Sequence, residues 1–208
     1  MFGVRFNAAT RAQLQRIATP SSGGGPEAIW HQFYDTQTYV DNVTTRLTFF
    51  QNTNVDNTIT NMPAAGQLPD PQWLSIYSIT CDFLTQNSSI VGASQVAGEY
   101  NDLALLLKIG RPNFVLTISD KRYGPYSLSL LHATGGPVGF QASGNTAATG
   151  NAQLANNTFT PGWNYFGSVT IPPKTNFNIE CVWAAAQDLT GNVLIRLSLH
   201  GILSRRVL

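Results

Sequence analysis

The sequence predicts an all-β protein, and three observations indicate this class. Runs of β-branched and aromatic residues alternate with polar residues at a period of two along most of the chain. Segments rich in Gly, Pro, Asn and Asp separate these runs. Strands do not alternate with long helical patterns, which argues against parallel α/β folds. We therefore expect about eight antiparallel strands in a two-sheet sandwich, and 208 residues suit one such domain.

The chain is poor in charge. Only 11% of its residues are Asp, Glu, Lys or Arg, whereas soluble domains carry about 25%. The net charge of +1 argues against a strongly electrostatic nucleic-acid binder, and the 43% hydrophobic content argues against a disordered chain. We expect other subunits to cover much of this surface. The alternative is an extracellular β-protein kept soluble by uncharged polar side chains.

Residues 1–26 are predicted to form an arm, and residues 27–208 a single domain. Good helix formers at 8–18 predict a short amphipathic helix, and the Gly-rich stretch 19–26 predicts a flexible linker. The arm lacks the apolar stretch of a secretory signal, so synthesis in a cytoplasm is expected. Its basic residues are candidate contacts for nucleic acid or for neighbouring subunits: Arg5, Arg11 and Arg16.

The first part of the domain contains three segments. EAIWHQFY at 27–34 has an apolar spacing that allows one or two helical turns against the body. The β-branched and aromatic residues of 39–51 predict the first long strand. After a polar loop, 73–84 alternates cleanly and predicts another strand. Its core-facing residues are predicted to be Trp73, Ser75, Tyr77, Ile79, Cys81 and Phe83.

The stretch 101–110 is compatible with a helix or a buried strand, because a short apolar run does not distinguish the two. The sequence SDKRYG predicts a hairpin turn with a solvated basic pair, Lys121 and Arg122. A long charge-poor excursion, Gly135–Trp163, is expected between two later strands. The remaining strands are predicted at 113–119, 126–133, 165–171, 176–186 and 192–203.

Pro172 and Pro173 lack backbone donors, so they are expected at a strand exit. Lys174 should then be exposed at a corner between two strands. The following stripe should be buried: Phe177, Ile179, Cys181 and Trp183. Taken together, the elements fit best an antiparallel eight-stranded jelly-roll sandwich preceded by a helical or extended arm. An immunoglobulin-like sandwich is the alternative, although its Cys...Trp...Cys spacing is missing.

Nothing in the sequence predicts catalysis, a cofactor or a metal site. The histidines, at 31, 132 and 200, show no metal-binding spacing. No nucleophile elbow, phosphate-binding loop or close carboxylate pair is present. Cys81 and Cys181 are expected to be free and buried. We therefore do not expect an enzyme.

Two aromatic pairs are candidates for a ligand-binding platform. Trp163 and Tyr165 lie beside the long excursion, and Tyr123 and Tyr126 flank Gly124-Pro125. The alternative for both pairs is ordinary aromatic packing at the ends of the sheets.

Several features of the chain together resemble those of a known protein family. The arm, the glycine linker, the low charge and the closing strand are similar to the single jelly-roll capsid proteins of small tailless icosahedral viruses, bacteriophages among them. The segments that carry the resemblance are TTRLTFFQ, PDPQWLSIYSITCDF, FGSVTIPPKTNFNIECVW and NVLIRLSLHGILSRRVL, within Thr44–Leu208.

The resemblance implies a structural virion protein that self-assembles into an icosahedral shell around a genome. Its partners would be copies of itself, other virion proteins and packaged nucleic acid reached by the arm. It would be made in the host cytoplasm and located in the capsid, with no transmembrane segment. The arm is less basic than those that package RNA directly, which leaves room for a DNA-containing particle, an internal membrane or a minor vertex protein. The alternative function is a receptor- or carbohydrate-binding jelly-roll module of a viral spike, a fibre or a lectin.

Overall fold

The structure, a computed structural model, describes residues 26–53, 56–85, 105–131, 140–143, 151–154, 165–189 and 191–206. The arm helix, the linker up to residue 25 and most of the excursion 135–163 lie outside these ranges.

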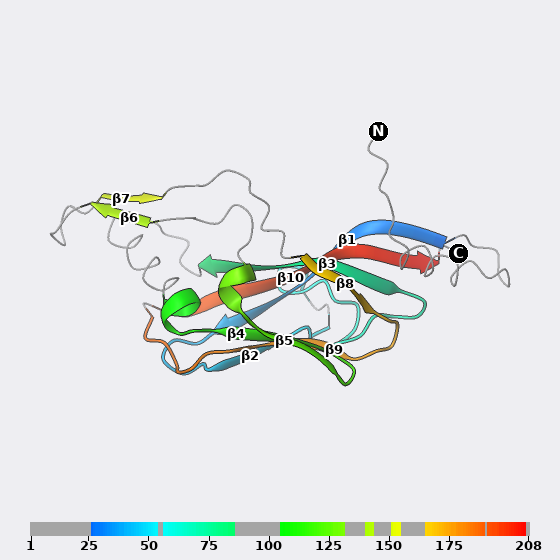
Figure 1. Ribbon diagram of the computed structural model, residues 1–208, viewed down its shortest axis with the longest axis horizontal. Helices are drawn as coiled ribbons and strands as arrows, with labels where there is room; N and C mark the ends of the chain where they lie inside the picture. Colours follow the sequence, from blue (N-terminus) through cyan, green and yellow to red (C-terminus); the bar gives the residue numbers. More distant parts are fainter. Residues whose placement is uncertain are drawn as a thin grey trace.

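Strands dominate the described residues (Figure 1). Two short helical segments interrupt them: η1 is a π-helical turn and η2 a 3₁₀ turn. The elements are β1 (Pro26–Tyr39), β2 (Arg46–Phe49), β3 (Trp73–Thr85), η1 (Leu105–Ile109), β4 (Asn113–Ile118), β5 (Lys121–Ser127), η2 (Leu128–Leu131), β6 (Phe140–Ser143), β7 (Asn151–Leu154), β8 (Tyr165–Ile171), β9 (Phe177–Val182) and β10 (Val193–Arg206).

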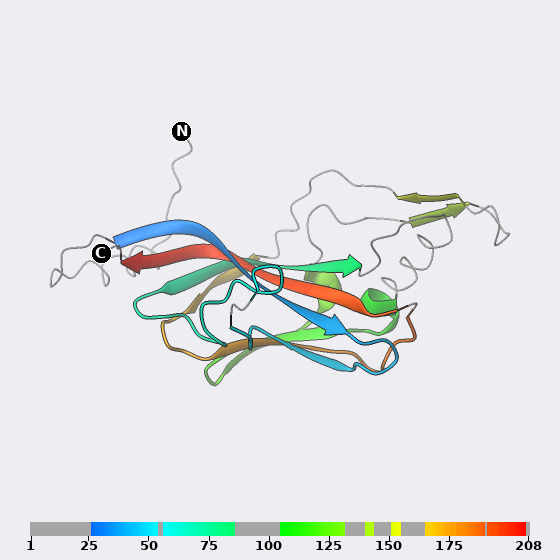
Figure 2. The ribbon, with the colours of Figure 1, turned by 180° about the vertical axis from the view of Figure 1, so that it is seen from behind.

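Eight of the strands form two four-stranded antiparallel sheets. One sheet has the order β1-β10-β3-β8 and the other β2-β9-β4-β5. Figures 1 and 2 show them as two layers, with the β6-β7 ribbon lying apart. The all-β, two-sheet prediction is confirmed.

The pairs of strands are nested. β4 pairs with β5, β3 with β8, β2 with β9, and β1 with β10. The chain is thus one long hairpin folded over into a sandwich. The pairs β10-β3 and β9-β4 then join the nested pairs within each sheet.

The helical prediction for 27–34 is wrong, because this segment lies within the 14-residue strand β1. Its apolar residues occupy both faces of the strand: Phe33 is buried, whereas Trp30 is exposed. Apolar residues on both faces of a strand give a spacing similar to that of a helix. The backbone of β1 pairs with β10 along its whole length, and this pairing holds the segment as a strand. The predicted long strand at 39–51 is also wrong in extent, since β2 has only four residues.

The face prediction for β3 is confirmed in its second half and wrong in its first half. Ile79 and Cys81 are buried as expected, but Leu74 and Ile76 are buried too, on what should have been the outer face. A register shift between Ile76 and Ser78 changes the phase of the alternation.

Gly201 allows the two backbones to approach each other at this irregularity. A Cβ at this position would lie 2.1 Å from the Ser75 carbonyl oxygen. The matching register shift on β10 falls between His200 and Gly201. The bulge thus depends on a glycine of a distant strand, which the sequence of β3 alone does not reveal.

The hairpin containing the basic pair is confirmed, with a shift in its position. The turn is Ser119-Asp120, while Lys121 and Arg122 begin β5 and are exposed. The strand predicted at 126–133 is wrong over Leu128–Leu131, which forms η2, and residues 132–133 lie outside the described residues. For 101–110, Leu105–Ile109 forms the π-helical turn η1, so this part is helical.

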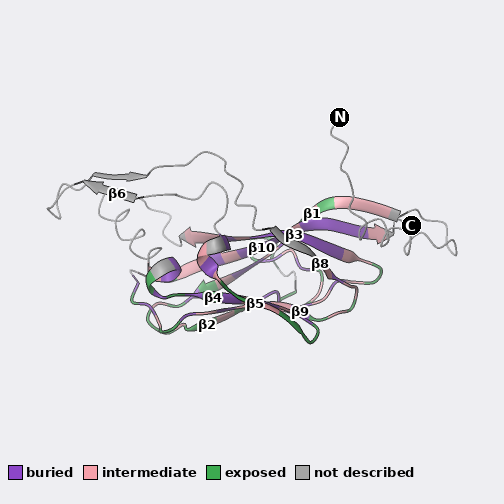
Figure 3. Cartoon of the chain, viewed as in Figure 1, coloured by how far each residue is buried: buried purple, intermediate pink, exposed green. Residues whose placement is uncertain are grey.

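The core lies between the two sheets, and Figure 3 shows buried segments along β10 and β3 and exposed segments along β5. The Pro-Pro corner prediction is confirmed: it connects β8 in one sheet to β9 in the other, with Lys174 exposed. The predicted stripe is buried at every position: Phe177, Ile179, Cys181 and Trp183. Cys81 and Cys181 are free and buried as predicted, and burial raises the pKa of both thiols.

Candidate functional site

Only some of the predicted site residues fall in the described part of the chain. Arg5, Arg11, Arg16 and Trp163 lie outside it. Tyr165 begins β8, where its backbone pairs with Ser78, but its side chain is outside the description. Of the predicted platform residues, Tyr123 and Tyr126 remain to be placed.

Tyr123 and Tyr126 both lie on β5 but do not form a single platform. Tyr123 packs against the core. Tyr126 is 42% exposed, and its ring packs on Phe114 with a centroid distance of 5.6 Å. Tyr126 pairs with Phe114 and Tyr123 with Leu116, and a register shift lies between the two pairs. Of these two rings, that of Tyr126 is the exposed one.

The most exposed aromatic side chain of the described residues is one that the sequence analysis did not select. Trp30 on β1 is 57% exposed. Its ring contacts Tyr77 of β3, with centroids 6.2 Å apart. β10 lies between these two strands, and Ile202, the β10 partner of Trp30, is buried. An aromatic pair therefore spans the outer face of the β1-β10-β3-β8 sheet, and alternation along 28–38 was the signal that could have revealed it.

Polar contacts surround this aromatic pair on the same sheet. His200 and Thr80 are hydrogen-bonded at 2.9 Å between Nε2 and Oγ1. Burial lowers the pKa of His200, which favours the neutral imidazole. Arg196 lies 4.8 Å from the Tyr34 ring centroid and donates from Nε to Thr36 Oγ1. These groups therefore have partners within the same sheet.

The edge of β1 that faces away from β10 is capped along only part of its length. Asn61 accepts a hydrogen bond from Tyr34 N–H at 2.7 Å and donates to the Gln32 carbonyl, also at 2.7 Å. Within the described residues, no group caps the same edge at Ala28 and Trp30. Among the described residues, the backbone donors and acceptors on this part of the edge therefore have no partner.

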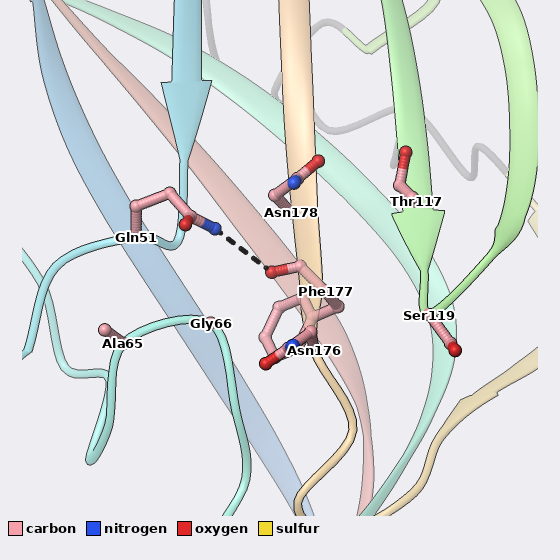
Figure 4. A pocket seen from close by; sticks show the side chains of 8 residues that line it. All are labelled: Gln51, Ala65, Gly66, Thr117, Ser119, Asn176, Phe177 and Asn178. Carbon is pink, nitrogen blue, oxygen red and sulfur yellow. Dashed lines mark hydrogen bonds between the residues drawn. The ribbon is translucent and has the colours of Figure 1, made fainter.

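A small pocket of about 280 Å³ lies beside the end of β4 and the start of β9 (Figure 4). Gln51 donates from Nε2 to the Phe177 carbonyl across it, at 3.4 Å. Amide and hydroxyl groups both donate and accept, so this lining suits a neutral polyhydroxylated molecule more than an ion. The polar residues that line the pocket are Gln51, Thr117, Ser119, Asn176 and Asn178.

The described residues contain no cluster of three or more His, Cys, Asp or Glu side chains that could hold a metal ion. His31 and His200, the two histidines in this part of the chain, have different neighbours. The ring of His31 packs on Phe33 with a centroid distance of 4.4 Å, whereas His200 bonds to Thr80. Among the same residues, no helix is long and apolar enough to cross a membrane.

Comparisons with protein-family models, with curated proteins and with solved structures found no match. The functional interpretation therefore relies on the fold and on the surfaces described above.

Proposed function

We propose that this chain is a jelly-roll capsid subunit, which assembles with copies of itself into an icosahedral shell around a viral genome. The observation that carries the proposal is the nested pairing of strands. Four antiparallel pairs, from β4-β5 out to β1-β10, wrap one hairpin into two four-stranded sheets. This arrangement is what a jelly roll requires, with eight strands in two packed sheets.

The exposed surface supports the same proposal. Large apolar side chains are exposed among the described residues, and only 11% of the chain is charged. A surface with few charges and exposed aromatic and aliphatic groups tends to associate. Burial between subunits would cover these groups. The exposed large apolar side chains are Trp30, Val40, Val43, Ile59, Ile109 and Tyr126.

The arm has a role in this proposal as well. Arg5, Arg11 and Arg16 would contact neighbouring subunits or packaged nucleic acid. Three positive charges give a modest affinity for phosphates that weakens with salt. The proposed localisation is the capsid of a virion formed in the host cytoplasm, and we propose no enzymatic activity.

Sedimentation velocity of the purified full-length chain tests the proposal. A shell subunit should form large particles of uniform size that negative-stain images show as closed shells. A stable monomer or trimer over the whole accessible concentration range would contradict the proposal.

The polar pocket favours a second candidate function, that of a carbohydrate- or receptor-binding jelly-roll module. Its lining of uncharged amides and hydroxyls complements sugar hydroxyls. A small oligomer that binds glycans in the sedimentation experiment would favour this second function over the first.

A further inference from the structure

β1 is the least protected of the sheet edges whose side chains the structure describes. Residues 28–34, AIWHQFY, contain no charged residue, no Gly and no Pro. Exposed strand edges of this composition are prone to pair with another strand. Figures 1 and 2 both show β1 at the outer edge of its sheet.

The edge strands of the other sheet carry the usual protective features. β5 has Lys121, Arg122 and Pro125, and β2 is only four residues long and begins with Arg46. Charged side chains, proline and short length all discourage edge pairing. The contrast marks β1 as the edge where a partner strand is tolerated.

The hydrogen bonds to Asn61 show which residues of β1 point outward. Tyr34 N–H and the Gln32 carbonyl both face Asn61, away from β10. Because peptide groups alternate in direction along a strand, those of Ala28 and Trp30 face the same way. Neither residue has a backbone partner on that side among the described residues.

We propose that β1 pairs antiparallel with β1 of a second copy of the chain, about a two-fold axis that passes beside Ile29. In this register Ala28 lies opposite Trp30 of the second copy, and the two exchange N–H···O bonds in both directions. The symmetric pair does the same, which gives four hydrogen bonds. The two four-stranded sheets then join into one continuous sheet.

The side chains fit this register. The small Ala28 lies opposite the large Trp30, whose ring leans over β10 toward Tyr77 and so leaves the edge beside Ala28 uncrowded on the outer face. Glu27, whose carboxylate already accepts a hydrogen bond from Arg205 Nε at 2.7 Å, lies opposite His31 of the second copy, and its second oxygen can accept from that ring. These pairs are self-complementary, as a closed two-fold interface requires.

The ends of the register also match. Pro26 lies opposite Gln32 of the second copy, and Pro26 has no N–H to donate. The carbonyl of Gln32 does not need a donor there, because the Asn61 side chain already donates to it. The pairing therefore stops where the internal cap begins. Complementarity at both ends favours a second copy over an unrelated strand.

Disulfide trapping tests the register in the full-length chain. Residue 29 is the position that lies opposite itself, as a non-hydrogen-bonded pair with Cα atoms about 4.5 Å apart, which is within disulfide range. Oxidised glutathione accepts the two electrons and two protons, and is itself reduced to two thiols. Ile29→Cys should form a covalent dimer, whereas Gln32→Cys and Thr38→Cys, on the same strand, should not.

The unsubstituted chain is the control for Cys81 and Cys181, which are buried. A covalent dimer of Ile29→Cys no more abundant than that of Gln32→Cys would overturn the proposal. Dimers of Trp30→Cys in place of Ile29→Cys would overturn the register.

A second pair of variants keeps the proposal testable if Ile29→Cys does not fold. Trp30→Lys places a charge on the edge and should weaken dimerisation, measured by sedimentation equilibrium, by about tenfold or more. Thr38→Lys, which is exposed on the same strand outside the register, should leave it unchanged. Equal dimerisation of the two variants would overturn the pairing.

This inference deepens the proposed shell by naming one contact, and the two can fail separately. Trapped dimers without large particles would retain the pairing and contradict the shell. Large particles without trapped dimers would support the shell and contradict the pairing.

Discussion

Asp35 places a carboxyl group inside the sandwich. Its residue is fully buried, and one carboxylate oxygen accepts from Phe50 N–H at 2.6 Å and from Gln37 Nε2 at 3.0 Å. Burial raises the pKa of Asp35, and these hydrogen bonds offset the rise only in part. The carboxyl group thus links β1 to Phe50, the residue that follows β2, although burial disfavours its ionised form.

The direction of this shift predicts how stability depends on pH. Because the folded pKa is raised, the unfolded chain ionises first, and this group lowers the stability as the pH rises from about 3.9, the ordinary pKa of Asp. Above the folded pKa the penalty is constant. Asp35→Asn removes the titration and keeps an oxygen acceptor for Phe50 N–H. We expect the variant to gain stability over the parent chain between pH 4 and pH 7 in urea unfolding. A gain at pH 4 that disappears at pH 7 would contradict this account.

Gly201 allows a second prediction at the residue scale. A methyl group there would meet the Ser75 carbonyl oxygen at 2.1 Å, so either β3 or β10 must move. We expect Gly201→Ala to lower the free energy of unfolding by about 3 kcal/mol, at the upper end of overpacking costs. Gly191→Ala is the matched control, since nothing lies within 4 Å of its Cβ position, and it should change stability by less than about 0.5 kcal/mol. Equal effects of the two substitutions in denaturant titrations would show that the close approach is not a constraint.

At the scale of the elements, Trp183 connects the end of β9 to η1. Its indole Nε1 donates to the Leu106 carbonyl at 3.0 Å, and its ring meets Tyr39 edge-on with a centroid distance of 4.9 Å. We expect Trp183→Phe to destabilise the fold by about 1–3 kcal/mol, because the buried Leu106 carbonyl loses its donor. Trp30→Phe, at an exposed position, is the control and should be close to neutral. If chemical denaturation gives the same midpoint for both variants, the Trp183 hydrogen bond does not stabilise the fold.

Individual strands could be predicted from the sequence where the alternation is uninterrupted. β9 is such a strand, and its inward stripe from Phe177 to Trp183 was predicted residue by residue. β3 was predicted only in its second half, because the bulge near Tyr77 depends on Gly201 of a distant strand. β1 was missed as a strand because apolar residues on both of its faces gave a helical spacing.

The candidate surface residues could likewise be predicted only where they did not depend on pairing with a distant strand. Tyr123 and Tyr126 were predicted on either side of Gly124-Pro125, and the structure places both on β5, where Tyr126 is exposed and Tyr123 packs against the core. Trp30 was overlooked because it lay in a segment assigned to helix. The pocket brings Gln51 together with Asn178 from the far end of the sequence, and no local pattern predicts such a contact.

At the scale of the whole molecule, the two-sheet class could be predicted, whereas the extra ribbon β6-β7 and the pairing of the strands could not. Period-two alternation states which segments are strands, but not which strands pair. The pairing of β1 with β10 joins the two ends of the described chain, and such long-range contacts are set by the shape of the assembled core. The nesting is also the observation on which the proposed shell subunit rests.

The most direct test of the central claim is electron cryo-microscopy of the purified full-length chain under conditions in which it assembles. The account predicts closed particles with icosahedral symmetry, in which each subunit is a sandwich of β1-β10-β3-β8 on β2-β9-β4-β5. Small oligomers with an open surface, and no closed particles at any concentration, would contradict it.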